Sequence, residues 1–122
     1  MTHPIPPEKM AVYRRTHRQR VAEARRRQAE RRERAMAQKA AEMLRSRYGV
    51  GSVVLFGSLA RGEVFDHRSD VDLAVTGLTE RDYLRALAHL LDLDMEIDVD
   101  LVMLETARPT LAAHIAAEGI SL

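Results

Sequence analysis

The feature that most constrains the fold is a long stretch without helix breakers. From Glu8 to Tyr48 the sequence contains no glycine or proline, and alanine, arginine, glutamate, glutamine and methionine dominate it. These residue types have high helix propensity, so the stretch predicts one long helix. A flexible leader over 1–7 with three prolines precedes it, and Gly49 after it predicts a C-terminal cap. Residues 49–122 are left to form the folded core.

The helix and the core differ sharply in charge. Residues 1–50 contain 14 Lys/Arg and 5 Glu, whereas residues 51–122 contain 5 Arg and 13 Asp/Glu, so net charges of +9 and −8 add to the overall +1. Three interpretations of the basic helix are open. In the first, it is a solvated helix stabilised by Glu–Arg pairs. In the second, it docks on an acidic protein or on a second copy of the chain. In the third, it contacts nucleic-acid phosphates. The nucleic-acid interpretation ranks third, since no aromatic or base-reading pattern interleaves the arginines.

The helix has a face to bury only near its C-terminal end. Between Arg14 and Arg34, Val21 is the only large apolar residue, so this part is expected to project from the domain. Pairs such as Glu23–Arg27 and Glu30–Arg34 have the spacing and order that support a solvated helix. Four residues at three-to-four spacing are expected to pack on the core: Met36, Ala40, Met43 and Leu44.

Composition excludes several classes of protein. The chain has no cysteine, which rules out disulfide frameworks and thiolate metal sites and favours the cytoplasm. No apolar run approaches the roughly 18 residues of a membrane span, so no membrane association is expected. With 46% hydrophobic residues in 122, a single domain with a real core is expected.

The core alternates between strand and helix patterns, which predicts a small α/β (α+β) domain. Thr79 and Asp82 resemble a capping box, and the Leu84, Leu87 and Leu91 side chains that follow are expected to face the core. The expected elements are strands over 52–56, 70–75 and 96–104 and helices after Thr79 and from Pro109 to before Gly119.

A glycine-rich turn follows the first predicted strand. Gly57 allows backbone conformations and a close approach that a Cβ would block, and consecutive N–H groups after it suit a phosphate. Ser58 adds a hydroxyl donor and Arg61 a planar cation. The glycine spacing of the turn matches that of a P-loop, but the Lys and Ser/Thr of that motif are missing, which excludes it.

Carboxylates alternate with apolar residues on two later strands. Asp70 and Asp72 would leave one face of their strand about 7 Å apart, and Asp98 and Asp100 would do so on the last strand. Like charges side by side favour a divalent cation between them, and Mg²⁺ prefers a few carboxylates with substrate phosphates. Three such acids around two metal ions would suit phosphoryl or nucleotidyl transfer.

Together these segments resemble the minimal nucleotidyltransferases (MNT) of the DNA polymerase β superfamily over about residues 36–122. Their pattern, G-S-x-A-R-G, then S-D-x-D-L, then an Asp before two aliphatic residues, is met at the following positions: Gly57, Ser58, Ala60, Arg61, Gly62, Ser69, Asp70, Asp72, Leu73 and Asp100. The resemblance implies a polymerase-β-like domain with a mixed sheet flanked by helices, here preceded by the long basic helix. It also selects Asp100 over Asp98 as the third carboxylate.

The resemblance further implies roles for these residues. Asp70, Asp72 and Asp100 would be the catalytic and metal-binding residues for two Mg²⁺ ions. Gly57 and Ser58 would hold the phosphates of ATP, with Arg61 and Ser69 as supporting contacts. MNT proteins are commonly antitoxins that transfer AMP to a tyrosine of a HEPN-type toxin, so a cytoplasmic protein adenylyltransferase with such a toxin as partner is expected. Self-association through the basic helix is a further expectation.

Three alternatives stay open. The fold could persist without activity and neutralise a partner by binding alone. The acceptor could also be a small molecule, or the end of an RNA. Only about 20 residues follow the third carboxylate, which leaves little chain for a separate acceptor-binding domain.

Overall fold

The computed structural model describes residues 4–63 and 70–122. The six predicted elements are present in the predicted order, with two short helices and a short strand in addition. The elements are α1 (Pro7–Tyr48), β1 (Val53–Phe56), α2 (Gly57–Ala60), β2 (Asp70–Val75), α3 (Glu80–Leu93), β3 (Asp98–Met103), the 3₁₀ turn η1 (Leu104–Thr106), α4 (Pro109–Glu118) and β4 (Ile120–Ser121).

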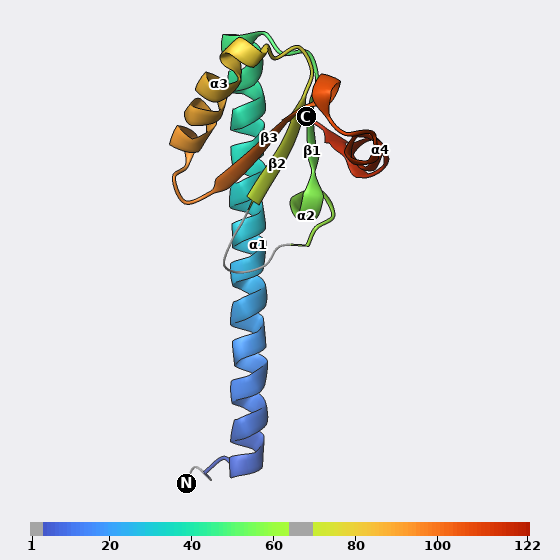
Figure 1. Cartoon of the computed structure of the whole chain (residues 1–122). Helices are drawn as coiled ribbons and strands as arrows, with labels where there is room; N and C mark the ends of the chain where they lie inside the picture. Colours follow the sequence, from blue (N-terminus) through green and yellow to red (C-terminus); the bar gives the residue numbers. More distant parts are fainter. Residues whose placement is uncertain (1–3, 64–69) are drawn as a thin grey trace.

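The strands form one mixed sheet in the order β3-β2-β1-β4. β1 is antiparallel to both β2 and β4, and β2 is parallel to β3. α1 and α3 lie on one side of the sheet, and α4 lies on the other (Figure 1). The mixed sheet flanked by helices confirms the predicted fold class.

The alternation of side chains along β2 divides the core into two clusters. Val71, Leu73 and Val75 are fully buried in the larger cluster, which α1 and α3 cover. Ala74 points to the opposite face, where it packs with Phe56 of β1 and Ile115 of α4. The two-residue period of a strand therefore sets which face of the sheet each β2 residue occupies.

α1 packs on the core only through its last turns, as the sequence predicts. Its buried residues all lie within 33–44, and Gly49 ends it with a left-handed conformation (φ +63°). The Glu30–Arg34 ion pair forms at 3.1 Å, whereas Glu23 and Arg27 form none among the described residues. The N-terminal part of α1 extends well below the sheet (Figure 1). In the part of the chain that the structure describes, no helix is long and apolar enough to cross a membrane.

The predicted core face of α3 is wrong for Leu84 and Leu91 and confirmed for Leu87, which packs against the larger cluster. Leu84 is 75% exposed and Leu91 40% exposed, whereas Ala86 and Leu90 are fully buried and Leu87 is half-buried. The cap is as predicted, because the Thr79 hydroxyl accepts a hydrogen bond from the backbone N–H of Asp82. The small Ala86 side chain lets α3 lie close to both α1 and the sheet. Close helix packing decides the buried face here, because Ala86 and Leu90 belong to the larger cluster and Leu84 and Leu91 lie outside it.

Candidate functional site

The phosphate-turn candidate begins at the last residue of β1. Phe56 is extended, and Gly57 turns the chain with φ +77° into the single turn of α2. Backbone hydrogen bonds close the turn, among them Arg61 N–H to Gly57 O at 3.2 Å and Glu63 N–H to Ser58 O at 2.8 Å. A positive φ at this position favours glycine, as the sequence predicts. Ser58 follows as a half-buried residue.

The Asp72 carboxylate lies directly against Gly57. A Cβ at position 57 would overlap the Asp72 Oδ2 atom and would lie 3.0 Å from Cγ. The contact follows from the sheet, in which Phe56 at the end of β1 is the register partner of Asp72 on β2. The structure thus brings together the turn and one of the predicted carboxylates, which are 15 residues apart in the sequence.

The carboxylates of β2 and β3 occur as register partners. Asp72 pairs with Asp100, and Asp70 pairs with Asp98, in the parallel β2–β3 ladder. Register partners in neighbouring strands point to the same face, which for Asp72 and Asp100 is the α4 side of the sheet. Asp72 is half-buried, and Asp98 and Asp100 are exposed. Asp100, rather than Asp98, therefore lies beside the carboxylate that touches the turn.

Two predicted residues lie in part or in full outside the described structure. Asp70 begins β2, and its backbone is placed by the ladder, but its side chain is not among those described. Ser69 lies outside the described residues. Their proposed roles stay predictions from the sequence.

A divalent cation is compatible with the carboxylates that are present. Among the described side chains, no three acidic or histidine residues converge on one point. Mg²⁺ does not require three, because it is commonly bound by one or two carboxylates together with substrate phosphates. Asp72 and Asp100 on adjacent strands supply such a pair.

Arg61 contacts acidic side chains of the same domain. Its Nε lies 3.3 Å from Glu63 Oε2, and one of its terminal nitrogens lies 3.3 Å from Glu118 Oε2 on α4. The hydrogen bond to Glu63, and to a lesser extent that to Glu118, raises the pKa of the Arg61 guanidinium above its ordinary value. Glu118 also lies 3.1 Å from His114 Nε2. In this conformation Arg61 ties α2 to α4.

Arg34 supports the turn from a distant part of the chain and was not predicted. A terminal nitrogen of Arg34 donates to the backbone carbonyl of Leu59 in α2 at 2.9 Å. The residues are 25 positions apart, and Arg34 lies within an arginine-rich run, so no local signal distinguishes it. Only the packing of α1 beside α2 reveals the contact.

Comparison with known proteins places these features in context. The family profile described as "Polymerase beta, Nucleotidyltransferase" matches residues 38–122. A structure assigned as a minimal nucleotidyltransferase is 33% identical, with a TM-score of 0.62 over 76% of this chain and 95% of that one. A chain of a toxin-antitoxin crystal structure with AMP-PNP is 27% identical, with a TM-score of 0.61 over 70% of each chain.

A more distant structure shares the fold. It is the complex of a tri-AMPylated Shewanella oneidensis HEPN toxin with an MNT antitoxin, of which a chain is 23% identical, with a TM-score of 0.55 over 73% of this chain and 70% of that one. The search of curated proteins finds no match. None of the three similar structures covers the whole of the present chain.

Proposed function

Because the chain belongs to the polymerase β nucleotidyltransferase family, we propose that it transfers AMP from ATP to a tyrosine hydroxyl of a HEPN-type toxin and thereby acts as the antitoxin. The observation that carries the proposal is the contact between the Asp72 carboxylate and Gly57, with Asp100 as the register partner of Asp72. This arrangement puts acidic side chains beside a turn suited to phosphates, as nucleotidyl transfer requires.

In the proposed reaction, the acceptor hydroxyl oxygen attacks the α-phosphorus of ATP. A new oxygen–phosphorus bond forms, the bond to the bridging oxygen between the α- and β-phosphorus breaks, and pyrophosphate leaves. The hydroxyl proton passes to Asp100 or to water. Gly57 and Ser58 hold the β- and γ-phosphates through backbone N–H groups and the serine hydroxyl.

In the proposal Asp70, Asp72 and Asp100 would hold Mg²⁺, which would supply charge neutralisation at the phosphates and a lowered pKa of the acceptor hydroxyl. The protein's own part is positional. The sheet register fixes Asp72 beside Asp100, and Gly57 lets the Asp72 carboxylate approach the turn without a clash. Arg61 and Arg34 hold α2 in place through Glu118 and the Leu59 carbonyl.

The choice of acceptor rests on the similar structures. One is a toxin-antitoxin crystal structure with AMP-PNP, an ATP analogue, and another contains a tri-AMPylated HEPN toxin. The cytoplasm, where ATP and such a toxin occur together, is the compartment that the proposal requires.

Mass spectrometry of the partner tests the proposal. The chain is incubated with Mg²⁺, each nucleoside triphosphate and the product of the neighbouring gene. The expected result is a mass gain of AMP on a tyrosine of that product, with ATP preferred. Asp72→Asn and Asp100→Asn should each lower the transfer rate on the order of 100-fold or more, as loss of a positioned acidic group does.

Asp98→Asn is the matched control, because it removes the same charge from the same strand without touching the Asp72–Asp100 pair. It should retain activity within a few-fold of the wild type. Full neutralisation of the toxin by an inactive Asp72→Asn form would instead support neutralisation by binding alone. A mass gain on a small molecule or an RNA end, but not on the protein, would show that this molecule is the acceptor and that the proposed protein acceptor is wrong.

A further inference from the structure

α1 has a long segment that the folded domain does not use. Residues 7–31, named here the projecting segment, contain no buried residue, and the first buried position of α1 is Glu33. At 1.5 Å per residue these 25 residues extend about 37 Å. Figure 1 shows them leaving the core at the end of the sheet where β2 and β3 begin.

The projecting segment carries a large positive charge that no acidic side chain of residues 4–63 and 70–122 neutralises by direct contact, leaving aside Asp70, whose side chain is not described. It contains nine Lys/Arg and three Glu, a net charge of +6. None of the nine cations has a carboxylate within 4.0 Å among the described residues, and the single ion pair of the segment joins Glu30 to Arg34 outside it. Because these cations are not held in ion pairs with described carboxylates, they are available to bind an anionic polymer.

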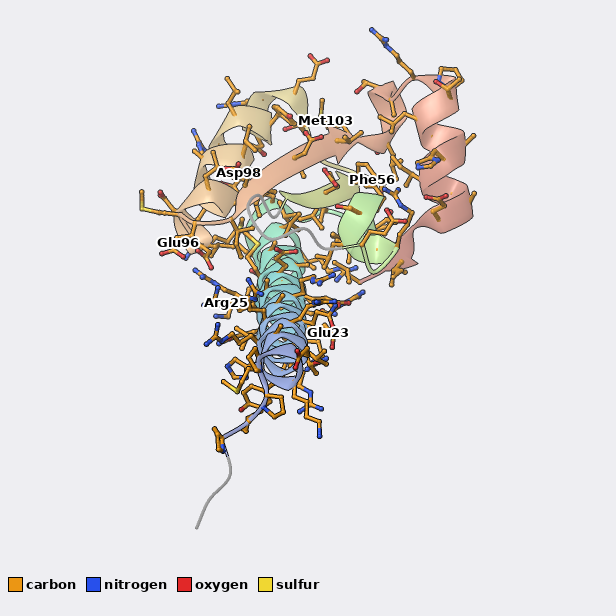
Figure 2. All side chains as sticks on the ribbon, turned by 90° about the horizontal axis from the view of Figure 1, so that it is seen from below. Glu23, Arg25, Phe56, Glu96, Asp98 and Met103 are labelled. Atoms are coloured by element: carbon orange, nitrogen blue, oxygen red, sulfur yellow. The ribbon has the colours of Figure 1, made fainter. Side chains whose placement is uncertain are left out.

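The cations are distributed around the helix rather than along one face. Side chains 11 positions apart on a helix differ by only about 20° in direction around its axis, so they lie in one row along the helix. Three arginine pairs have this spacing, and the three rows that they form are roughly a third of a turn apart around the axis. The pairs are Arg14–Arg25, Arg15–Arg26 and Arg20–Arg31. Figure 2, viewed nearly along α1, shows side chains leaving the helix on several sides. A flat acidic surface would meet one row, whereas a groove lined by phosphates would meet several.

A protein partner or a second copy of the chain would need an apolar stripe on this helix. The larger apolar side chains of the projecting segment, Met10, Val12, Tyr13 and Val21, do not form a continuous one. Val12 and Val21 point in nearly opposite directions, and the face that Met10 and Val21 share is interrupted by Arg14 and His17. The middle of a protein interface is depleted of charged residues, and here they predominate. The pattern favours a phosphate polymer over a folded protein.

We propose that the projecting segment binds the phosphate backbone of a duplex nucleic acid, with the helix lying in a groove. The major groove of B-DNA is about 12 Å wide and admits an α-helix with its side chains. Recognition is independent of sequence, because charge rather than base-reading side chains dominates the segment. The proposal does not depend on nucleotidyl transfer.

The bound duplex would lie at the same end of the domain as the candidate site. Just beyond the projecting segment, Arg32 contacts Asp94 and Glu96, which precede β3, at 2.9 Å. Arg34 contacts α2 through the Leu59 carbonyl. The nucleic acid is therefore brought to the edge of the sheet where the carboxylates lie.

Fluorescence anisotropy with the full chain tests the proposal. The probes are labelled mixed-sequence duplexes of about 20 base pairs, one of DNA and one of RNA, and the two arms show which is preferred. We expect binding to at least one of them, with an affinity that falls at least about tenfold between about 50 and 200 mM salt.

The decisive variant removes four arginines from two rows of the projecting segment. The substitutions are Arg14→Gln, Arg15→Gln, Arg25→Gln and Arg26→Gln. The control removes four exposed arginines elsewhere: Arg47→Gln, Arg81→Gln, Arg85→Gln and Arg108→Gln. Both variants lose the same charge. Only the first should weaken duplex binding at least about tenfold and reduce the salt dependence.

Two further measurements keep the result interpretable. Circular dichroism should show unchanged helix content, and replacing the first four arginines by lysine should retain most of the binding. Equal weakening in both glutamine variants would overturn the proposal. Displacement of the duplex by polyglutamate of equal charge would also overturn it, because the ligand would then be an acidic polypeptide. A dimer in light scattering that is dissociated only by the substitutions in the projecting segment would overturn it as well, because the segment would then bind a second copy of the chain.

Discussion

Gly57 shows how a single backbone position can hold a site together. Its φ of +77° is a conformation that side chains rarely adopt, and the Asp72 carboxylate occupies the space where a Cβ would stand. The motif that contains Gly57 was recognisable from the sequence together with Asp72. Its contact with Asp72 was not, because it depends on the β1–β2 register. The role of Asp100 beside Asp72 depends in the same way on the β2–β3 register.

Gly57→Ala is expected to abolish most nucleotidyl transfer, because Asp72 or α2 must move to make room for the methyl group. The control is Gly62→Ala, whose φ of +74° carries similar backbone strain while its Cβ would meet nothing within 4 Å. In urea unfolding, Gly62→Ala should lose about 1–2 kcal/mol from backbone strain alone, and Gly57→Ala should lose at least as much. Transfer rates measured side by side should differ at least about tenfold. Equal rates would show that the contact with Asp72 does not matter.

At the scale of elements, the sequence was informative where a pattern is long and uninformative where packing chooses between similar residues. The helix-forming run predicted α1 almost to the residue, and alternating residues predicted β2 and β3. β4 has only the residues Ile120 and Ser121, which become a strand by pairing with β1. The buried face of α3 contains Ala86 and Leu90, whereas hydrophobic periodicity alone favoured Leu84 and Leu91, which are exposed.

Gly119, at the junction of α4 and β4, gives a prediction at this scale. A Cβ there would overlap Val54 and would lie 2.5 Å from the Ile115 carbonyl oxygen, although φ is an ordinary −70°. Gly→Ala usually stabilises a protein by about 0.4–1 kcal/mol when the site accommodates the methyl group. Here overpacking should dominate, and Gly119→Ala should destabilise the fold by about 1–3 kcal/mol in urea unfolding. An unchanged or higher midpoint would contradict the close packing of α4 on β1.

The whole molecule combines a folded domain with a long helix, α1, of which only the C-terminal part packs on that domain. Hydrogen exchange should reveal the two halves of α1. Amides within 33–48 are protected by packing on α2, α3 and the sheet, whereas those within 7–28 have only the helix itself to protect them. We expect exchange at least about tenfold faster in the N-terminal part. Uniform protection along α1 would indicate a contact that holds the projecting segment.

The central claim is that one site is formed by the turn after β1 and the carboxylates of β2 and β3. The most direct test is a crystal structure with a non-hydrolysable ATP analogue and Mn²⁺, which is located by its anomalous scattering. We predict the β- and γ-phosphates at Gly57 and Ser58 and manganese within coordination distance of Asp72 and Asp100. A nucleotide bound elsewhere, or manganese peaks away from these two carboxylates, would contradict it.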